Sequence, residues 1–535
     1  MIRVYTNADV MTMNPEQPKA TTFGTFENRF LGVGSDQFLK TIPGTMVEHI
    51  DLQGKTVIPG FIESHNHLSM YAATLLQLDC RAETVRDIET LKREVRNKAN
   101  QTASGQWILG FGYDDTLISD CRHLNCSDLD VAAPHHPVLI MHVSAHLAYA
   151  NSKAMVISGV GSETPDPEGG HIDRDPAGRP SGLLLEPAAI DLVKKHVPKL
   201  NTGQYRSLLK RAIPYYHRHG ITSSHDGAIG YTKDAPEIIE AYRHLEAAGE
   251  LGLRVYMTIM HSYYDQLTSL GLGSAFGSDL LKLGSVKLFQ DGSIQALTAA
   301  LSDDYLNRPG HRGECIHPQE NLNHLIEKYH RLGLQIAVHA NGDRAIDSVL
   351  QAIDRAQHLA PRGDCRHMLI HTQMATLDHV RRMKALQVIP SYFVNHVFYW
   401  GDRHRDLFLG HERASTIDPL GTSLREGLPF TLHSDLPVTP VDPLASIHNA
   451  VNRVTRQGKI LGADERIPVL EAFKAYTVNA AFCSFEENSK GSIVDGQLAD
   501  FAIISDNPLS ISPDKIKEIE ILGTYVGGTK VYEPR

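Results

Sequence analysis

The sequence predicts an α/β protein built on a (β/α)8 TIM barrel, with a large insertion after the first barrel strand and a small β-sandwich formed by both termini. Three observations predict this fold class. Eight apolar, strand-like segments alternate with helical stretches, and a gap of about 150 residues separates the first two of them. Short strands with glycine turns occupy both ends of the chain.

The eight strand-like segments define the expected barrel. They cover residues 58–65, 220–226, 253–260, 284–292, 334–343, 367–373, 386–395 and 428–435. Helical stretches such as 237–249 and 320–333, each ending at a glycine, separate several of them. Repetition of strand and helix gives parallel strands, and eight such strands close into a ring. We therefore expect the catalytic barrel to span residues 59–488.

The long gap after the first strand carries its own secondary structure. It contains a helical stretch at 82–102, strand-like segments at 107–115 and 136–151, and a glycine- and proline-rich hairpin at 164–182. Since a loop of this length needs a core of its own, it predicts an inserted subdomain over about 72–210. Loops that follow barrel strands face the active site, so we expect this subdomain at the barrel mouth.

The two ends of the chain resemble each other in pattern. Residues 1–58 and 489–535 read as short alternating strands broken by glycine turns. Neither set of strands is large enough to be stable alone, so both are expected to pack into one small β-sandwich.

Composition excludes several classes of function. The chain is 42% hydrophobic and 21% charged, which is typical of a soluble globular protein. A formal net charge of −10 argues against nucleic-acid binding, and no run approaches the roughly 20 apolar residues of a membrane span. The N-terminus lacks the features of a signal peptide. Six scattered cysteines without a C-x-x-C pair predict reduced thiols and a cytoplasmic location.

Polar side chains stand where the barrel strands are expected to end. They are His65 and His67 on strand one, Lys287 on strand four, His339 on strand five, His371 on strand six and Asp435 on strand eight. Residues two apart on a strand share a face, so the H-x-H pair can offer two nitrogens to one ion. All strand ends of a closed barrel meet at one rim, which predicts a site for one or two divalent metal ions. A buried lysine there suits carbamylation, which would make it a bridging carboxylate.

Nearly the whole chain resembles the amidohydrolase superfamily, in the branch that contains N-substituted formamide deformylase. The resemblance rests on PGFIESHNH, WILGFGYDD, HVSAHLAYANSKAM, VKLFQDGS, AVHANGDRAI, HSDLPV, EAFKAYTVNAA and KGSIVDGQLADFAII. It implies that His65, His67, His339 and His371 are metal ligands, that Asp435 is both a ligand and a proton shuttle, and that Lys287 occupies the position that is carboxylated in relatives with two metals. It also implies zinc as the metal. Glu63 stands where the family often has aspartate.

The expected chemistry is hydrolysis by metal-activated hydroxide. A bound divalent ion lowers the pKa of water to about 7, and the hydroxide attacks a carbonyl carbon while Asp435 moves the proton to the leaving nitrogen. His146 is a candidate donor to the oxyanion. The alternative for His146 is a core histidine bonded to a neighbouring carbonyl.

Five residues are candidates for substrate binding: Tyr113, Asp114, Asp291, His396 and Trp400. The first two lie in the insertion, and they have the alternative of a simple turn edge. Asp291 precedes a glycine, so it could equally be a turn-forming residue. His396 and Trp400 follow strand seven, where Trp400 could instead pack a loop.

The predicted function is cleavage of a C–N bond other than a peptide bond, in an amide, an N-formyl compound or a cyclic amide. Deamination of an aromatic ring is the alternative within the same superfamily. Deaminases of this barrel usually carry glutamate three residues after the strand-five histidine, and here Gly342 follows His339 at that spacing. A non-catalytic scaffold is the third reading. The expected partner is a small molecule, and a homodimer is the default assembly.

Overall fold

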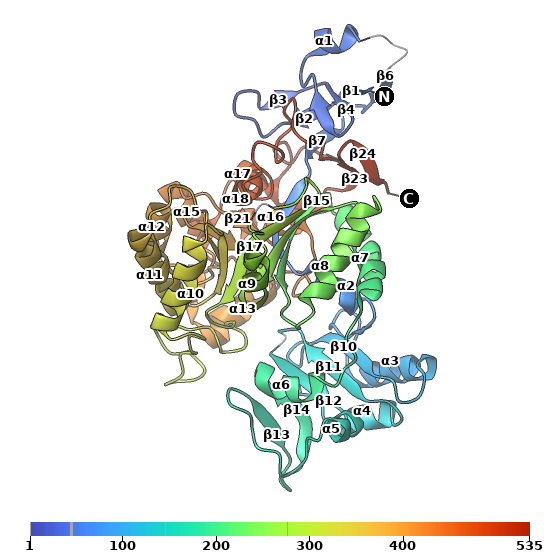
Figure 1. Ribbon diagram of the computed structural model, residues 1–535, viewed down its shortest axis with the longest axis vertical. Helices are drawn as coiled ribbons and strands as arrows, with labels where there is room; N and C mark the ends of the chain where they lie inside the picture. The colour runs from blue at the N-terminus through green and yellow to red at the C-terminus, as the bar shows by residue number, and fades with distance from the viewer. Residues whose placement is uncertain (1, 43–46, 145, 275, 535) are drawn as a thin grey trace. The chain divides into compact units, whose positions relative to one another are not determined.

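The computed structural model describes residues 2–42, 47–144, 146–274 and 276–534 (Figure 1). The chain separates into two compact units. One combines Met1–Ser69 with Leu209–Arg535, and the other is Met70–Leu208. Among the helices in the described ranges, none has the length and apolar character needed to cross a bilayer.

The larger unit is organised around an eight-stranded parallel sheet whose strands neighbour one another in sequence order. Its strands are β8 (Phe61–Asn66), β15 (Ile221–Ile229), β16 (Arg254–Met260), β17 (Leu281–Phe289), β18 (Ile336–Ala340), β19 (Met368–His371), β20 (Ile389–Tyr392) and β21 (Thr431–Leu432). Most of their residues are buried, because helices cover the outer face and side chains fill the interior. The predicted fold class, a TIM barrel with an insertion and sheets at the termini, is confirmed.

The first predicted strand, 58–65, is two strands. Thr56–Pro59 (β7) belongs to the terminal sheet, and after a single intervening residue β8 begins at Phe61 in the barrel. Gly60 lies at the break, and a Cβ there would come within 2.3 Å of the Thr222 side chain. Because β15 packs so closely at this point, only glycine fits at position 60, where the chain passes from one sheet to the other.

The barrel closes between β8 and β21 without a regular ladder among the described residues. Ser64 Oγ donates to the Leu432 carbonyl at 2.9 Å, and the Ser434 amide donates to Glu63 Oε1 at 2.8 Å. Just beyond the strands, the His67 amide donates to the Leu436 carbonyl at 2.8 Å. We call this side-chain-rich junction of β8 and β21 the seam.

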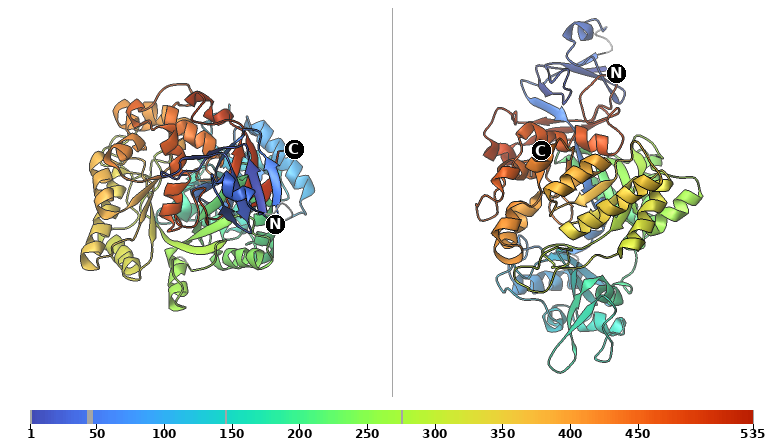
Figure 2. Two further views of the ribbon diagram at one scale, coloured as in Figure 1. Left: turned by 90° about the horizontal axis from the view of Figure 1, so that it is seen from above. Right: turned by 90° about the vertical axis from the view of Figure 1, so that its left-hand side faces the viewer.

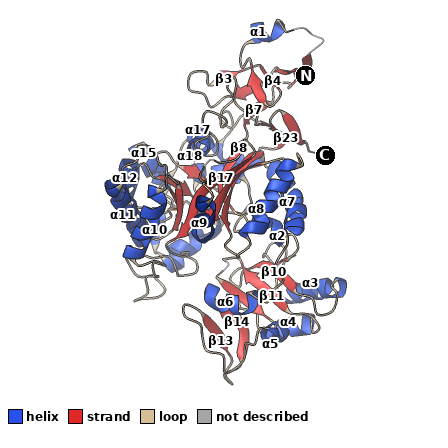
Figure 3. Cartoon of the chain, in the orientation of Figure 1, coloured by secondary structure: helices blue, strands red, loops and turns tan. Residues whose placement is uncertain are grey.

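Helices surround the barrel (Figure 3). They are α8 (Ala235–Ala247), α9 (His261–Ser269), α10 (Gln319–Arg331), α11 (Asp343–Leu359), α12 (Leu377–Leu386), α13 (Asn395–Arg403), α14 (His411–Ser415), α15 (Leu420–Glu426), α16 (Pro443–Asn452), α17 (Val469–Ala475) and α18 (Val478–Cys483). Helix α12 shows how the sequence sets such bounds: Thr376 caps its start in a capping box with His379, and Gln387 ends it in a left-handed conformation.

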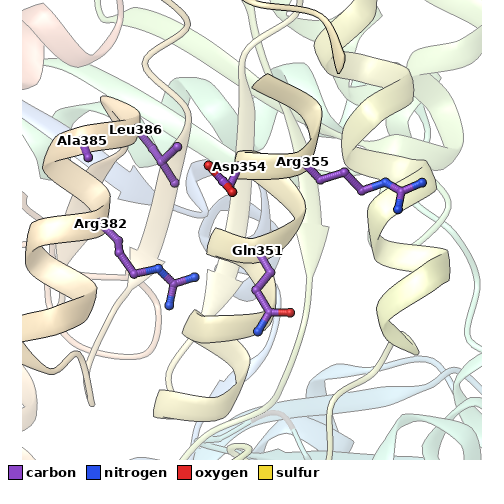
Figure 4. A pocket seen from close by; sticks show the side chains of 6 residues that line it. All are labelled: Gln351, Asp354, Arg355, Arg382, Ala385 and Leu386. Atoms are coloured by element: carbon purple, nitrogen blue, oxygen red, sulfur yellow. The ribbon is translucent and has the colours of Figure 1, made fainter. Parts of the chain in front are cut away.

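A surface pocket lies between two of these outer helices (Figure 4). Gln351, Asp354 and Arg355 line it from α11, and Arg382, Ala385 and Leu386 line it from α12. None of the six stands at the carboxyl end of a barrel strand. This pocket is therefore separate from the predicted chemistry.

Both termini build two small sheets of the larger unit, where blue and red strands lie together in Figure 2. The strands are β1 (Ile2–Thr6), β2 (Asp9–Met11), β3 (Lys19–Ala20), β4 (Phe23–Phe26), β5 (Arg29–Leu31), β6 (Val47–Asp51), β7, β22 (Phe501–Ile504), β23 (Ile521–Val526) and β24 (Thr529–Tyr532). Aromatic rings fill the space between them. Tyr5 stacks on Phe23 at 4.7 Å, and Phe501 stacks on Tyr525 at 4.3 Å, so residues from both ends share one core.

The second unit, Met70–Leu208, is a six-stranded sheet with helices. Its elements are β9 (Leu78–Asp79), α3 (Ile88–Gln101), β10 (Ile108–Tyr113), α4 (Cys126–Ala132), β11 (Val138–His142), β12 (Leu147–Ala150), α5 (Ser152–Ile157), β13 (His171–Arg174), β14 (Pro180–Leu185) and α6 (Glu186–Lys194); α2 (Leu68–Thr74) and α7 (Thr202–His217) cross its boundaries. The segment 136–151, predicted as one strand, forms the antiparallel pair β11 and β12. Local bonds explain the break, because the Ser144 amide donates to His142 Nδ1 at 3.1 Å.

Candidate metal centre

The larger unit brings together the six residues predicted as metal ligands. Asp435 Oδ1 lies 3.2 Å from His67 Nε2 and 3.6 Å from His65 Nε2. Lys287 Nζ is 3.5 Å from His65 Nε2. The His371 ring centroid is 4.6 Å from that of His339 and 5.8 Å from that of His65. Residues that are far apart in sequence thus share one end of the barrel.

A seventh residue, His433, belongs to the same cluster and was not singled out from the sequence. Its Nε2 lies 3.2 Å from His371 Nδ1, and its ring centroid is 5.3 Å from that of His65. Ligand atoms of His371, His433 and Asp435 lie within 4.8 Å of one another, as do those of His65, His67 and Asp435. The two groups share Asp435. The available signal was the alternation His433-Ser434-Asp435, the same spacing as His65-Asn66-His67.

The end of β15 holds the H-x-H pair in place. His67 Nδ1 lies 2.8 Å from the Gly227 carbonyl, which can only accept, so Nδ1 carries a proton and Nε2 faces Asp435. A Cβ on Gly227 would come within 2.6 Å of the His65 ring. Next to it, both oxygens of Asp226 accept from the Ser69 amide at 3.2 Å. The Gly227 carbonyl thus orients the His67 ring, and the lack of a side chain at Gly227 leaves room for the His65 ring.

Asp291 holds the strand-five histidine. Its carboxylate accepts the amides of Asn341 at 2.9 Å, Gly342 at 2.7 Å and Ala300 at 3.0 Å. Its Oδ1 lies 3.3 Å from His339 Nδ1. A carboxylate behind a histidine is the usual support of a metal-ligating imidazole. Contact between Asp291 and substrate remains a prediction.

Two members of the cluster have unusual backbone conformations. His371 has φ +73° and Asp435 has φ +56°, both in the left-handed region that non-glycine residues seldom adopt. Such conformations cost on the order of 1–3 kcal/mol each, and they persist where the surrounding structure imposes them. Here they turn the chain where β19 ends and just beyond β21, at two of the clustered side chains.

Burial determines the charge of the cluster. It lowers the pKa of His65 and His371 well below the ordinary range and that of His433 to about 3, so these rings are neutral. Burial also lowers the pKa of Lys287 to about 7. Burial opposes ionisation of Asp435, but His67 and neighbouring positive charges outweigh it and lower its pKa to about 2.

The residues fit a divalent cation. Asp435 Oδ1 is buried and has no hydrogen-bond partner among the described residues. Buried polar atoms without partners are rare in native proteins and indicate a missing ion, water or ligand. Neutral imidazoles combined with one carboxylate are a ligand set that zinc and similar ions accept.

Comparison with known proteins decides the family. The amidohydrolase family matches residues 48–532. The chain belongs to the amidohydrolase family.

Relatives of this amidohydrolase share its full length. N-substituted formamide deformylase of Arthrobacter pascens is 28% identical, with 98% of this chain and 97% of the relative covered. Protein LONG AFTER FAR-RED 3 of Arabidopsis thaliana is 31% identical, with 98% and 91% covered. A solved structure described as an uncharacterized metal-dependent hydrolase of Pyrococcus horikoshii OT3 is 25% identical, with a TM-score of 0.79 over 96% of this chain and 99% of that one.

The other predicted site residues of this amidohydrolase lie in two places. In the larger unit, the ring centroid of His396 is 6.3 Å from that of His371. Trp400 is buried, and its ring centroid lies 6.0 Å from that of His396. In the smaller unit, Tyr113 donates to the Arg122 carbonyl at 2.8 Å, Asp114 accepts the Thr116 amide at 2.9 Å, and His146 Nδ1 lies 2.9 Å from Glu186 Oε2. Contacts of all five with substrate remain predictions.

Proposed function

We propose that this amidohydrolase is a metal-dependent hydrolase that cleaves a C–N bond other than a peptide bond, in an amide, an N-formyl compound or a cyclic amide. The observation that carries the proposal is the buried cluster of neutral imidazoles around Asp435, whose Oδ1 lacks a hydrogen-bond partner among the described residues. The names of two relatives, a formamide deformylase and a metal-dependent hydrolase, support it.

The proposed ligands are His65, His67, His339, His371 and Asp435, and the metal is most simply zinc, which prefers nitrogen and oxygen donors in this combination. His433 is a further donor within reach of Asp435. When bound, the ion supplies Lewis acidity and a lowered pKa for water. The buried imidazoles need lose no proton to bind it, because they are already neutral.

Lys287 decides how many ions the site holds. Its side chain is fully buried, with Nζ near His65 and 4.9 Å from the centre of the Phe289 ring. As an amine it offers one neutral donor, which suits a single ion. Reaction of that amine with carbon dioxide would give a carbamate and release one proton, and the added carboxylate would suit a second ion.

Asp435 is the proposed proton carrier. Its Oδ1 accepts the proton of the attacking water, and the same atom returns that proton to the leaving nitrogen, so it acts first as base and then as acid. A pKa well below neutrality keeps it ionised for the first step. His146 is the proposed donor to the oxyanion, with Glu186 holding its Nδ1.

Metal removal and restoration test the proposal. Metal bound to the purified protein is measured, removed with a chelator and restored one ion type at a time, while amine release from N-formyl amines, anilides and lactams is followed. Activity that disappears with the metal and returns with it is the expected result. Amide hydrolysis that ignores the chelator would overturn the proposal, and ammonia release from aminated aromatic rings alone would favour the deaminase.

A further inference from the structure

A second polar group lies beside the metal cluster, on the side of His371. It consists of Gln373, His396, His404 and Asp418, which are each at most 2% exposed. Gln373 follows β19, His396 lies in the first turn of α13, His404 begins a π-helical turn (His404–Phe408), and Asp418 precedes α15. Four chain segments thus contribute to one buried group.

Direct contacts join the four side chains in pairs. His396 Nδ1 lies 3.3 Å from Asp418 Oδ1, and Gln373 Nε2 lies 3.4 Å from His404 Nδ1. The rings of His396 and His404 are 5.9 Å apart between centroids. Since the His396 ring is also 6.3 Å from that of His371, the group borders the metal ligands.

Asp418 is held more firmly than a surface loop residue would be. It has φ +46°, its amide donates to the Gln373 carbonyl at 2.8 Å, and its carbonyl accepts Arg453 Nη1 at 3.1 Å. Arg453 is fully buried and also donates to the carbonyls of Ile417 and Leu461 at 2.7 Å. The buried guanidinium therefore fixes the backbone on which the Asp418 carboxylate stands.

Three atoms of the group have no hydrogen-bond partner within the described part of the chain: Asp418 Oδ2, Gln373 Oε1 and His404 Nε2. Leaving a buried carboxylate oxygen without a donor is costly, and several such atoms in one place indicate a group that arrives from outside. An ionised carboxylate oxygen only accepts hydrogen bonds. The arriving group must therefore donate one.

We infer that Gln373, His396, His404 and Asp418 form a subsite that receives an N–H group of the amide substrate, with Asp418 Oδ2 as the acceptor. Asp418 is at the same time the positioning residue of His396, whose Nδ1 faces the other carboxylate oxygen. The inference rests on the proposed function, and it names the substrate class as secondary amides, which carry an N–H, rather than tertiary amides.

A matched pair of substrates tests the subsite. N-phenethylformamide has an N–H, and N-methyl-N-phenethylformamide replaces it with a methyl group. The wild-type chain, loaded with metal, should hydrolyse the first with a kcat/KM about 10- to 100-fold higher, because a hydrogen bond to a buried carboxylate is lost with the second. Equal kcat/KM for the two compounds would overturn the inference.

Variants separate the subsite from steric exclusion of the methyl group. Asp418→Asn should lower the ratio of kcat/KM toward one, because a neutral amide offers one oxygen and is a weaker acceptor than a carboxylate. Metal content and thermal midpoint should stay near those of wild type. Asp354→Asn, at the surface pocket on α11, is the matched control and should keep the wild-type ratio. A subsite that holds only ordered water predicts the same ratio in Asp418→Asn as in wild type, which would also overturn the inference.

Binding measurements distinguish this inference from the proposed function. If neither formamide, nor any of the anilides and lactams, is hydrolysed under metal control, the proposed function fails. Calorimetry with the two formamides then tests the subsite alone. Tighter binding of the N–H compound to wild type, and not to Asp418→Asn, supports the subsite, whereas equal binding to both proteins rejects it.

Discussion

Two groups of buried histidines lie at opposite ends of the same strand, β19. His371 ends the strand and belongs to the candidate metal centre, whereas His367 precedes its first residue and lies with His330 and Cys365. Burial lowers the pKa of His371 and His367 well below the ordinary range. In each group, potential ligand atoms come within 4.8 Å of one another. Residue type, burial and spacing therefore do not distinguish the groups.

Hydrogen-bond partners do distinguish them. The Ile336 amide donates to His367 Nδ1 at 3.1 Å, His367 Nε2 donates to His330 Nδ1 at 2.9 Å, and His330 Nε2 donates to the Ala360 carbonyl at 2.8 Å. Every ring nitrogen of His367 and His330 therefore has a hydrogen-bond partner within the fold. At the other end of β19, Asp435 Oδ1 has no such partner in the described ranges. A buried histidine cluster is a candidate metal site when a potential ligand atom beside it remains without a hydrogen-bond partner.

The largest expected effect comes from Asp435→Asn. The variant keeps the size of the side chain but removes the charge and the proton-accepting oxygen, so kcat should fall by about 10²- to 10⁴-fold. Steady-state kinetics and metal analysis measure it, with Asp354→Asn as the control. Retention of full kcat would show that the free carboxylate has no part in catalysis, and the distinction drawn between the two groups would lose its functional meaning.

Acid should weaken both groups in the metal-free protein. An unfolded histidine takes up a proton near pH 6.5, but these buried rings do so only at much lower pH, so the unfolded state binds more protons below pH 6.5. Each such ring should remove about 1.4 kcal/mol of stability per pH unit as the pH falls from 6.5. Urea unfolding between pH 7 and pH 5 measures the loss. Bound metal should raise stability across this range without changing the slope, because a metal-bound ring stays unprotonated in the folded state just as a buried neutral ring does. A stability that does not change between pH 7 and pH 5 would contradict the prediction.

Paired substitutions on β19 should separate metal binding from stability. His371→Gln should weaken metal affinity by about 10- to 100-fold or more. His367→Gln should leave metal affinity unchanged and lower the free energy of unfolding by about 1–3 kcal/mol, because partners of both ring nitrogens become unsatisfied. Metal titration and urea unfolding of both variants provide the readouts. Loss of metal in His367→Gln would show that the His367 group binds an ion, which would contradict the prediction.

A smaller effect is expected at the seam, where Glu63 accepts the Ser434 amide next to Asp435. Glu63→Ala should lower the free energy of unfolding by about 1–3 kcal/mol, because it leaves that buried amide without its acceptor. Glu63→Gln retains an acceptor oxygen and should stay close to wild type. Unfolding and metal titration of both variants check this. Equal losses in the two would show that the charge of Glu63, rather than its hydrogen bond, is what matters.

The sequence predicted the barrel and the proximity of the candidate ligands, because strand ends of a closed barrel meet wherever they lie in the chain. His65, His67, His339, His371 and Asp435 could be selected on that ground. His433 could have been selected from its spacing to Asp435. By contrast, of the group around Asp418 only His396 was selected from the sequence, because the rest depends on the conformation of loops fixed by Arg453.

The positions where strands break could also not be predicted from the sequence. The apolar run through Gly60 looks continuous, and only the approach of Thr222 shows why the chain changes sheets there. In the same way, 136–151 was predicted as one strand, but side-chain bonds near His142 divide it. Hydrophobic pattern reports burial, whereas contacts between distant segments decide where a strand ends.

If the metal is held as proposed, the seam gives it a part in biogenesis. His65 and His67 belong to the first strand of the barrel to be synthesised, and Asp435 follows the last. A cation bound by all three would tie the opening strand to the closing one, so the full set of ligands would form only after translation has passed Asp435. Metal supply would then control not only turnover but also how long a newly made chain stays vulnerable to proteases.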